Sequence, residues 1–199
     1  MGAVRHSPTL VSDALGEPMI NVGSSRDHRA HRASRWYGEW LEWMWMLEGG
    51  VRRVHGRHIT CHLYERNICA GGPRVLVYTH DGLVIPGRRD RVPVRVEFHE
   101  VPPYDTYGLP ARDYPRVFAD RGAASPHRMP DDQALCLYKP GDPEDRCWYS
   151  QRGLESLLNL TRNHLYSEMR WRDGGGDDTA AWLTDEADHG FPQAGRRAS

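Results

Sequence analysis

Residues 92–99 carry a large apolar side chain at every second position, and this alternation constrains the fold more than any other part of the sequence. Val92, Val94, Val96 and Phe98 occupy every second position. Because successive side chains of a β-strand point to opposite faces, all four lie on one face of a strand. That face needs a covering layer, so we expect a sheet with other elements packed against it.

Two further segments upstream have strand character. Residues 59–64 and 74–80 are short runs rich in β-branched, aromatic and other apolar side chains. The pair Asp81-Gly82 then predicts a hairpin turn into residues 83–85. Together with residues 92–99, these segments predict an antiparallel meander sheet of about four strands, and therefore an α+β fold.

Helical spacing flanks this meander on both sides. In residues 35–50 the apolar stripe consists of Trp36, Trp40, Trp43, Met44 and Leu47, and Gly49-Gly50 ends it. Such a tryptophan-rich helix either docks a partner or packs on the sheet, and packing is the simpler interpretation. Regularly spaced leucines predict a second helix over residues 151–171.

The segment between the sheet and the second helix is irregular and rich in proline. Residues 101–119 lack periodicity, and their interleaved aromatic side chains indicate an ordered loop packed on the sheet edge. Residues 1–25 and 191–199 also lack periodicity, and we expect a disordered tail and a flexible tail there. The rest, residues 26–190, predicts a single domain.

Composition excludes several classes of protein. The 26 basic and 27 acidic residues are well mixed, so we expect no nucleic-acid partner. No apolar run approaches the length of a membrane span, and no apolar segment follows the amino terminus, so we expect a cytoplasmic protein without a membrane partner. Four cysteines are too few for a disulfide scaffold and are expected to be free thiols.

One of these thiols stands in an informative context. Cys136 lies between two leucines after a polar turn, nine residues beyond His127 and shortly before the second predicted helix. A cysteine becomes a nucleophile where polar neighbours favour its thiolate. In an apolar string it is more commonly a small buried side chain. The string alone leaves both interpretations open.

The order of elements is similar to that of ubiquitin-conjugating enzymes. In that family a strand leads into a Tyr-Pro and proline-rich active-site segment, a His-Pro-Asn string, a Cys-Leu pair and a Trp, followed by C-terminal helices. The matching residues here are 92–98, Tyr114-Pro115, His127, Cys136-Leu137 and Trp148. The resemblance spans most of the chain and implies the fold of that family.

The chain resembles most the bacterial branch of that family found in type II CBASS antiphage systems. The shared strings are Leu-Cys-Leu-Tyr at residues 135–138 and a His-Leu-x-x-Glu-x-x-Trp pattern at residues 164–171. A terminal Trp182 followed by Glu186 and His189 completes the likeness. The resemblance implies a role in antiphage defence, with a cyclic-oligonucleotide synthase as the protein partner.

By resemblance, Cys136 accepts the C-terminal carboxyl of a partner protein as a thioester and passes it to an amine. The chain has no room for an adenylating domain, so we expect that either a separate activating enzyme activates the donor or this protein takes an unusual route. His127 is expected to brace the active-site loop. The family's asparagine is replaced by Met129, which leaves Gln133, backbone amides near Cys136, or His189 as candidate assisting groups.

Two other functions stay open. The missing asparagine is compatible with an inactive adaptor of the same fold that binds a protein tail, and Cys136 also suits removal of such a tail. No nucleotide or dinucleotide motif occurs, so we expect no cofactor. We also expect no metal, because the cluster of His55, His58, Cys61, His62 and Cys69 fits no zinc module.

Overall fold

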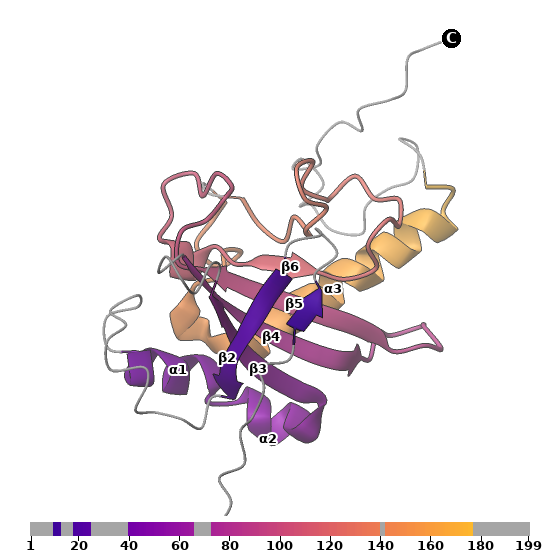
Figure 1. Ribbon diagram of the computed structural model, residues 1–199. Coiled ribbons are helices and arrows are strands. Elements are labelled where there is room, and N and C mark those ends of the chain that lie inside the picture. Colours follow the sequence, from indigo (N-terminus) through magenta and orange to yellow (C-terminus); the bar gives the residue numbers. More distant parts are fainter. Residues whose placement is uncertain (1–9, 13–17, 25–39, 66–72, 140–141, 177–199) are drawn as a thin grey trace, which may run out of the picture.

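The computed structural model describes residues 10–12, 18–24, 40–65, 73–139 and 142–176. These residues form an α+β fold, as expected, built on one antiparallel sheet with the strands in chain order (Figure 1). The strands are β1 (Leu10–Ser12), β2 (Pro18–Ser24), β3 (Ile59–Glu65), β4 (Arg74–Leu83), β5 (Val92–His99) and β6 (Arg116–Phe118).

Helices cover one face of this sheet. They are α1 (Trp40–Glu48), α2 (Val51–His55) and α3 (Gly153–Asp173), together with the short 3₁₀ turns η2 (Gly56–His58), η4 (Ala111–Asp113) and η5 (Ser150–Arg152). The long helix α3 runs across the sheet (Figure 1) and agrees within two residues at each end with the helix predicted over 151–171. No helix within the described part of the chain has the length and apolar character to cross a bilayer.

The register of the sheet explains why apolar side chains alternate in residues 92–99. Cys61 pairs with Tyr78, Tyr78 with Val96, and Val96 with Val117, so one row of buried side chains crosses four strands. The row belongs to the main core, which the leucines of α3 complete from the other side. The alternation of residues 92–99 is therefore the inner face of β5, as predicted.

Helix α1 packs on the sheet with one side and exposes the other. The Trp43 and Leu47 side chains are buried, and the Trp43 ring meets the Phe98 ring edge-on at 5.3 Å. The packing interpretation is confirmed for these two residues, whereas Trp45 is 73% exposed. Trp36 lies outside the described residues.

The predicted hairpin turn at Asp81-Gly82 is wrong. Strand β4 continues through both residues with a register shift between His80 and Leu83, and the chain reverses only within residues 84–91. A Cβ on Gly82 would lie 2.8 Å from the Arg91 Cβ, so glycine is needed here for close approach of two backbones. The pair therefore forms a β-bulge.

The sheet is wider than expected. Strands β1 and β2 lie within the segment predicted to be a disordered tail, and β2 pairs with the edge of β3. Their stability depends on pairing with another strand, which no local pattern reports. These two strands extend the predicted sheet of about four strands to six.

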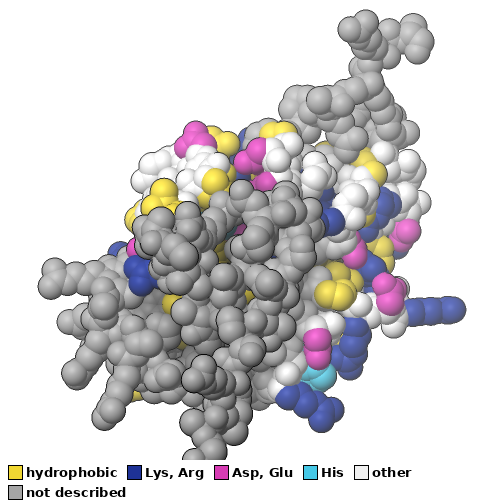
Figure 2. Space-filling view, viewed as in Figure 1, with side chains coloured by type: hydrophobic (Ala, Val, Ile, Leu, Met, Phe, Trp, Pro, Cys, Tyr) yellow, Lys and Arg dark blue, Asp and Glu magenta, His cyan; other side chains and the backbone are white. Residues whose placement is uncertain are grey.

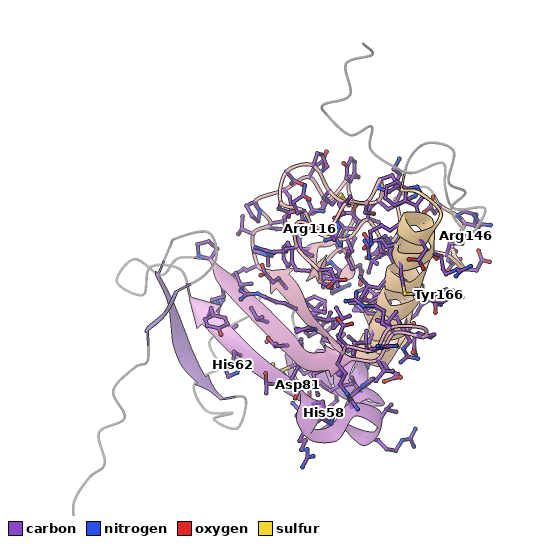
Figure 3. The ribbon with its side chains drawn as sticks, turned by 90° about the vertical axis from the view of Figure 1, so that its right-hand side faces the viewer. His58, His62, Asp81, Arg116, Arg146 and Tyr166 are labelled. Carbon is purple, nitrogen blue, oxygen red and sulfur yellow. The ribbon has the colours of Figure 1, made fainter. Side chains whose placement is uncertain are left out.

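The proline-rich segment packs as an ordered loop on the sheet edge, as predicted. The Tyr104 hydroxyl donates to the Tyr114 carbonyl at 3.1 Å, and the Tyr138 hydroxyl donates to the Asp113 carbonyl at 2.7 Å. The Arg116 guanidinium lies 3.8 Å from the centre of the Tyr104 ring. Figure 3 shows Arg116 among these loops, at the end of the molecule away from His58 and Asp81.

Charged side chains of both signs lie interspersed on the face seen in Figure 2. Exposed residues between β4 and β5 include Arg89, Asp90 and Arg91. The mixed signs agree with the net charge of −1.

Candidate functional site

The segment before Cys136 folds back on itself as a hairpin. The Cys136 amide donates to the His127 carbonyl at 3.0 Å, and the Met129 amide donates to the Ala134 carbonyl at 2.7 Å. A bridge between Arg128 and Leu135 lies between these two bonds. The nine-residue spacing of His127 and Cys136 therefore places their backbones opposite each other, which the sequence did not predict.

A tight turn closes this hairpin. The Gln133 amide donates to the Met129 carbonyl at 3.0 Å, and the Ala134 amide donates to Asp132 Oδ1 at 2.9 Å. Gln133 has a φ of 63°, in the left-handed region that costs a non-glycine residue about 1 kcal/mol or more. The Leu135 amide donates to the Val117 carbonyl at 2.8 Å and so docks the hairpin on β6.

A buried ion pair anchors the hairpin to α3. The Nε and Nη2 atoms of Arg128 lie 3.1 and 2.9 Å from the two carboxylate oxygens of Glu168. Arg128 Nη1 also donates to the Ala119 carbonyl at 2.8 Å. Glu168 is completely buried. The residue that follows His127 thus ties the hairpin to α3.

Other residues of the 164–171 pattern gather around the same carboxylate. His164 Nε2 lies 3.5 Å and Arg172 Nη1 lies 3.3 Å from Glu168 oxygens. Burial acts to raise the pKa of Glu168, but His164 and Arg128 outweigh it and hold the pKa at about 2. The His164 ring also meets the His127 ring edge-on at 6.1 Å. The pattern therefore supports the cysteine hairpin.

Cys136 is buried but has charged neighbours. Its side chain is 4% exposed, and burial raises the pKa of the thiol to about 11. Lys139 and Arg116 lower this pKa, while Asp142 raises it. The thiol is therefore neutral at pH 7. The positive charges of Lys139 and Arg116 nevertheless favour its thiolate.

Arg116 is held in place by acidic and aromatic groups. It lies 3.0 Å from Asp131 and 2.9 Å from Asp132, both in the turn of the hairpin. Its side chain is almost fully buried. This ion pair ties β6 to the turn and fixes a positive charge beside the thiol.

Tyr114 lies in the same buried cluster as Cys136 and has an unusual hydroxyl group. It is 3% exposed, and its ring meets the Tyr138 ring edge-on at 5.6 Å. Its hydroxyl has no hydrogen-bond partner among the described residues. Burial raises the pKa of this phenol, and the charge of a Cys136 thiolate raises it further.

The structure brings together three of the four predicted site residues. His127 is buried, its amide donates to Ser125 Oγ at 3.1 Å, and its carbonyl holds Cys136. Gln133 lies in the turn of the same hairpin. His189 lies outside the described residues. The sequence did not predict the pairing of Arg128 with Glu168, although Glu168 belongs to the pattern at residues 164–171.

The other described cysteines have different surroundings. Cys61 faces the core beside Tyr78, and burial raises its pKa to about 12. Cys147 is half-buried, with Sγ 3.6 Å from the Lys139 carbonyl and 3.5 Å from the Asp142 carbonyl. Within the described ranges, no three His, Cys, Asp or Glu side chains are placed to hold a metal ion.

The fold and site define an α+β protein with a buried cysteine on a hairpin anchored to a long helix. A comparison of the chain with protein-family models, curated proteins and solved structures finds no match.

Proposed function

We propose that the protein is a cysteine-dependent acyltransferase of the ubiquitin-conjugating type. Cys136 takes the C-terminal acyl group of a partner protein from an activating enzyme and passes it to an amine. The observation that carries this proposal is the way in which the hairpin bearing Cys136 is held in place. A buried ion pair between Arg128 and Glu168 fixes the hairpin that holds the thiol. Structural cysteines in a core need no such support.

The charges near the thiol favour the same chemistry. A thioester keeps its carbonyl electrophilic, and the thiolate is a good leaving group. Arg116 and Lys139 both lower the pKa of Cys136, and burial opposes them. A donor that opens the site to water removes part of the burial penalty and leaves the two cations. The nucleophile is thereby activated only when the acyl donor is bound.

A synthetic peptide with a C-terminal thioester tests the chemistry directly. We expect the wild type to gain the mass of the acyl group, and dithiothreitol to remove it. Cys136→Ser should form a slower adduct that resists dithiothreitol, because an oxygen ester replaces the thioester, and Cys136→Ala should form none. Cys147→Ser is the matched control and should behave as the wild type. An adduct confined to Cys147 would contradict the proposal.

The cellular role rests on the resemblance to the CBASS branch. We infer a cytoplasmic protein of antiphage defence whose acyl donor is a cyclic-oligonucleotide synthase. The test combines this protein with the synthase from the same gene neighbourhood, its activating enzyme and ATP. A reductant-sensitive adduct between Cys136 and the synthase is expected. If Cys136→Ala protects cells from phage as well as the wild type does, thiol chemistry is not the basis of defence.

One observation favours a second function, an adaptor that binds a protein tail without chemistry. The Cys136 thiol is 4% exposed, and its pKa is raised to about 11. An adaptor binds the synthase equally well with Cys136→Ala and forms no adduct. Removal of a tail is a third use of the same thiol. In that case the wild type cleaves an amide-linked synthase conjugate, and Cys136→Ala does not.

A further inference from the structure

Acyl transfer at Cys136 needs a group that stabilises negative charge on oxygen. Attack on the acyl carbon converts its carbonyl oxygen into an oxyanion, and a preorganised donor lowers the barrier to this step. The asparagine that the resemblance assigns to this region is Met129 here, and Met129 is buried and carries no donor. The donor must therefore come from elsewhere.

The backbone amides leading into the cysteine are already used. The amides of residues 133, 135 and 136 donate to the carbonyls of Met129, Val117 and His127. The amide of Ala134 donates to Asp132 Oδ1. Releasing any of them breaks the hairpin or its bond to β6. These four amides are therefore unsuited to the task.

Two of the charged side chains nearby are also engaged. The Arg128 guanidinium contacts the Glu168 carboxylate and the Ala119 carbonyl. Arg116 contacts Asp131 and Asp132. Both cations have anionic partners within 3.1 Å, so neither is the ready donor.

Tyr114 differs from these amides and from the two arginines. Its side chain is 97% buried, and its hydroxyl donates to no described residue. A buried polar group without a partner costs about 1–3 kcal/mol, and such a group in a folded protein calls for an explanation. A phenylalanine would fill the same space without that cost.

Tyr114 also packs in the same buried region as the reacting cysteine. Tyr114 and Cys136 belong to the same buried cluster, and the Tyr114 ring packs against Tyr138, two residues beyond the cysteine. The pKa of Tyr114 responds to the charge of the Cys136 thiolate. The Tyr114 and Cys136 side chains therefore share one buried environment.

We propose that the Tyr114 hydroxyl is the oxyanion donor for acyl transfer at Cys136. This inference rests on the proposed function. The Cys136 thiolate adds to the acyl carbon of the donor thioester, and the carbonyl π electrons move to oxygen. Tyr114 donates a hydrogen bond to that oxyanion and keeps its proton. The carbonyl re-forms, and the donor's thiolate leaves with the electrons of its carbon–sulfur bond.

Transfer to the amine uses the same donor. The amine nitrogen adds to the acyl carbon, and the oxyanion again accepts the hydrogen bond from Tyr114. Collapse expels the Cys136 thiolate, and the nitrogen loses a proton to water as the amide forms. In both steps the phenol stays neutral, in keeping with its raised pKa.

Tyr114→Phe tests this role because it removes a single oxygen that has no partner in the folded protein. The free energy of unfolding should be unchanged or slightly higher. With the peptide thioester as probe, the rate of adduct formation should fall about 100-fold, a typical loss for one oxyanion donor. Tyr104→Phe is the matched control, since its hydroxyl donates to the Tyr114 carbonyl and faces no oxyanion.

Alkylation of Cys136 by iodoacetamide separates this role from a change in the thiol itself. Alkylation needs the thiolate but forms no oxyanion, so Tyr114→Phe should leave its rate unchanged. Equal losses in alkylation and acylation would overturn the inference, as would acylation within twofold of the wild type. If the wild type itself forms no adduct at Cys136, the proposed function fails, and this result is distinct from either of those.

Discussion

At the scale of single residues, the environment of Cys136 sets two opposing demands. Burial protects the thiol and keeps it neutral, while Lys139 and Arg116 favour its thiolate. A thiol of this kind is inert until a partner changes its surroundings. Cys147 is half-buried and lies against the carbonyls of Lys139 and Asp142, so its reactivity gives an internal comparison.

The reactivity of Cys136 toward iodoacetamide should follow its raised pKa. Below the pKa the thiolate fraction grows about tenfold per pH unit, so the alkylation rate should keep rising from pH 8 to pH 10, toward a midpoint near pH 11. Mass spectrometry of peptides from protein labelled at each pH measures this. A rate that levels off below pH 9 would show that the cations outweigh burial.

Substitution of the charged neighbours should shift this profile in opposite directions. Lys139→Gln removes a charge that lowers the pKa of Cys136, so alkylation at pH 9 should slow several-fold. Asp142→Asn removes a charge that raises it, so alkylation at pH 9 should quicken. The two variants serve as controls for each other, because a loss of packing would accelerate both reactions.

At the scale of elements, the Arg128–Glu168 pair joins the cysteine hairpin to α3. Glu168→Gln leaves Arg128 as a buried charge without its counter-ion, and we expect a loss of about 3–5 kcal/mol in the free energy of unfolding. Arg128→Met combined with Glu168→Met should recover most of it, since an apolar pair of similar size replaces the ion pair. Urea unfolding measures both variants and their coupling.

The partly exposed neighbour gives the matched control for this experiment. Arg172 lies 3.3 Å from the same carboxylate, but its side chain is more open to water. Arg172→Met should therefore cost no more than about 1 kcal/mol. If Glu168→Gln costs as little as that, the hairpin is not anchored by this pair.

The predictable part of the fold lies where local sequence and tertiary structure agree. The alternation of residues 92–99 reports a strand because one face of β5 is buried along its whole length. Asp81-Gly82 has the composition of a turn, yet the close approach of Arg91 requires the same glycine for a bulge. A turn signal alone does not distinguish the two.

For the candidate site, the sequence singled out the cysteine and the histidine but not the groups that surround them. Cys136 and His127 follow from spacing and resemblance, but the partner of Arg128 lies 40 residues away on α3. The Tyr114 hydroxyl is unusual because it lacks a partner, and that property exists only after the chain has folded. Such long-range pairings carry no local periodicity.

At the scale of the whole molecule, a chain of polar contacts links the sheet to two helices. The Gly82 amide donates to His80 Nδ1 at 3.1 Å, so the proton of that ring is on Nε2. His80 Nε2 donates to His55 Nδ1 at 3.0 Å. The proton of His55 is then on Nε2, which lies 2.9 Å from Glu155 on α3. The His80 ring is neutral in this arrangement.

The surroundings of His80 resist its protonation. Burial lowers its pKa to about 4, and His55, His58 and Arg91 lower it while Asp81 raises it. Protonation would remove the acceptor at Nδ1 and place a charge in the core. Folding therefore favours the neutral ring.

The stability of the protein should consequently fall in acid in two separate windows. From pH 6.5 down to about pH 4, a histidine of the unfolded chain takes up a proton that folded His80 refuses, so stability falls as pH falls. From pH 4.5 down to about pH 2 the same argument applies to Glu168, whose folded pKa is depressed. Urea unfolding measured from pH 7 to pH 3 should show both slopes.

His80→Asn should remove the upper window alone. The asparagine carbonyl still accepts the Gly82 amide, but the side chain does not titrate, so we expect a lower free energy of unfolding at pH 7 and a flatter profile between pH 6.5 and pH 4. The loss that disappears should be about 1–2 kcal/mol, allowing for screening by solvent. Because this variant retains Glu168, its slope below pH 4.5 should persist. An unchanged slope between pH 6.5 and pH 4 would mean that folded His80 binds a proton as readily as the unfolded chain does, and the neutral ring that accepts the Gly82 amide would then be wrong.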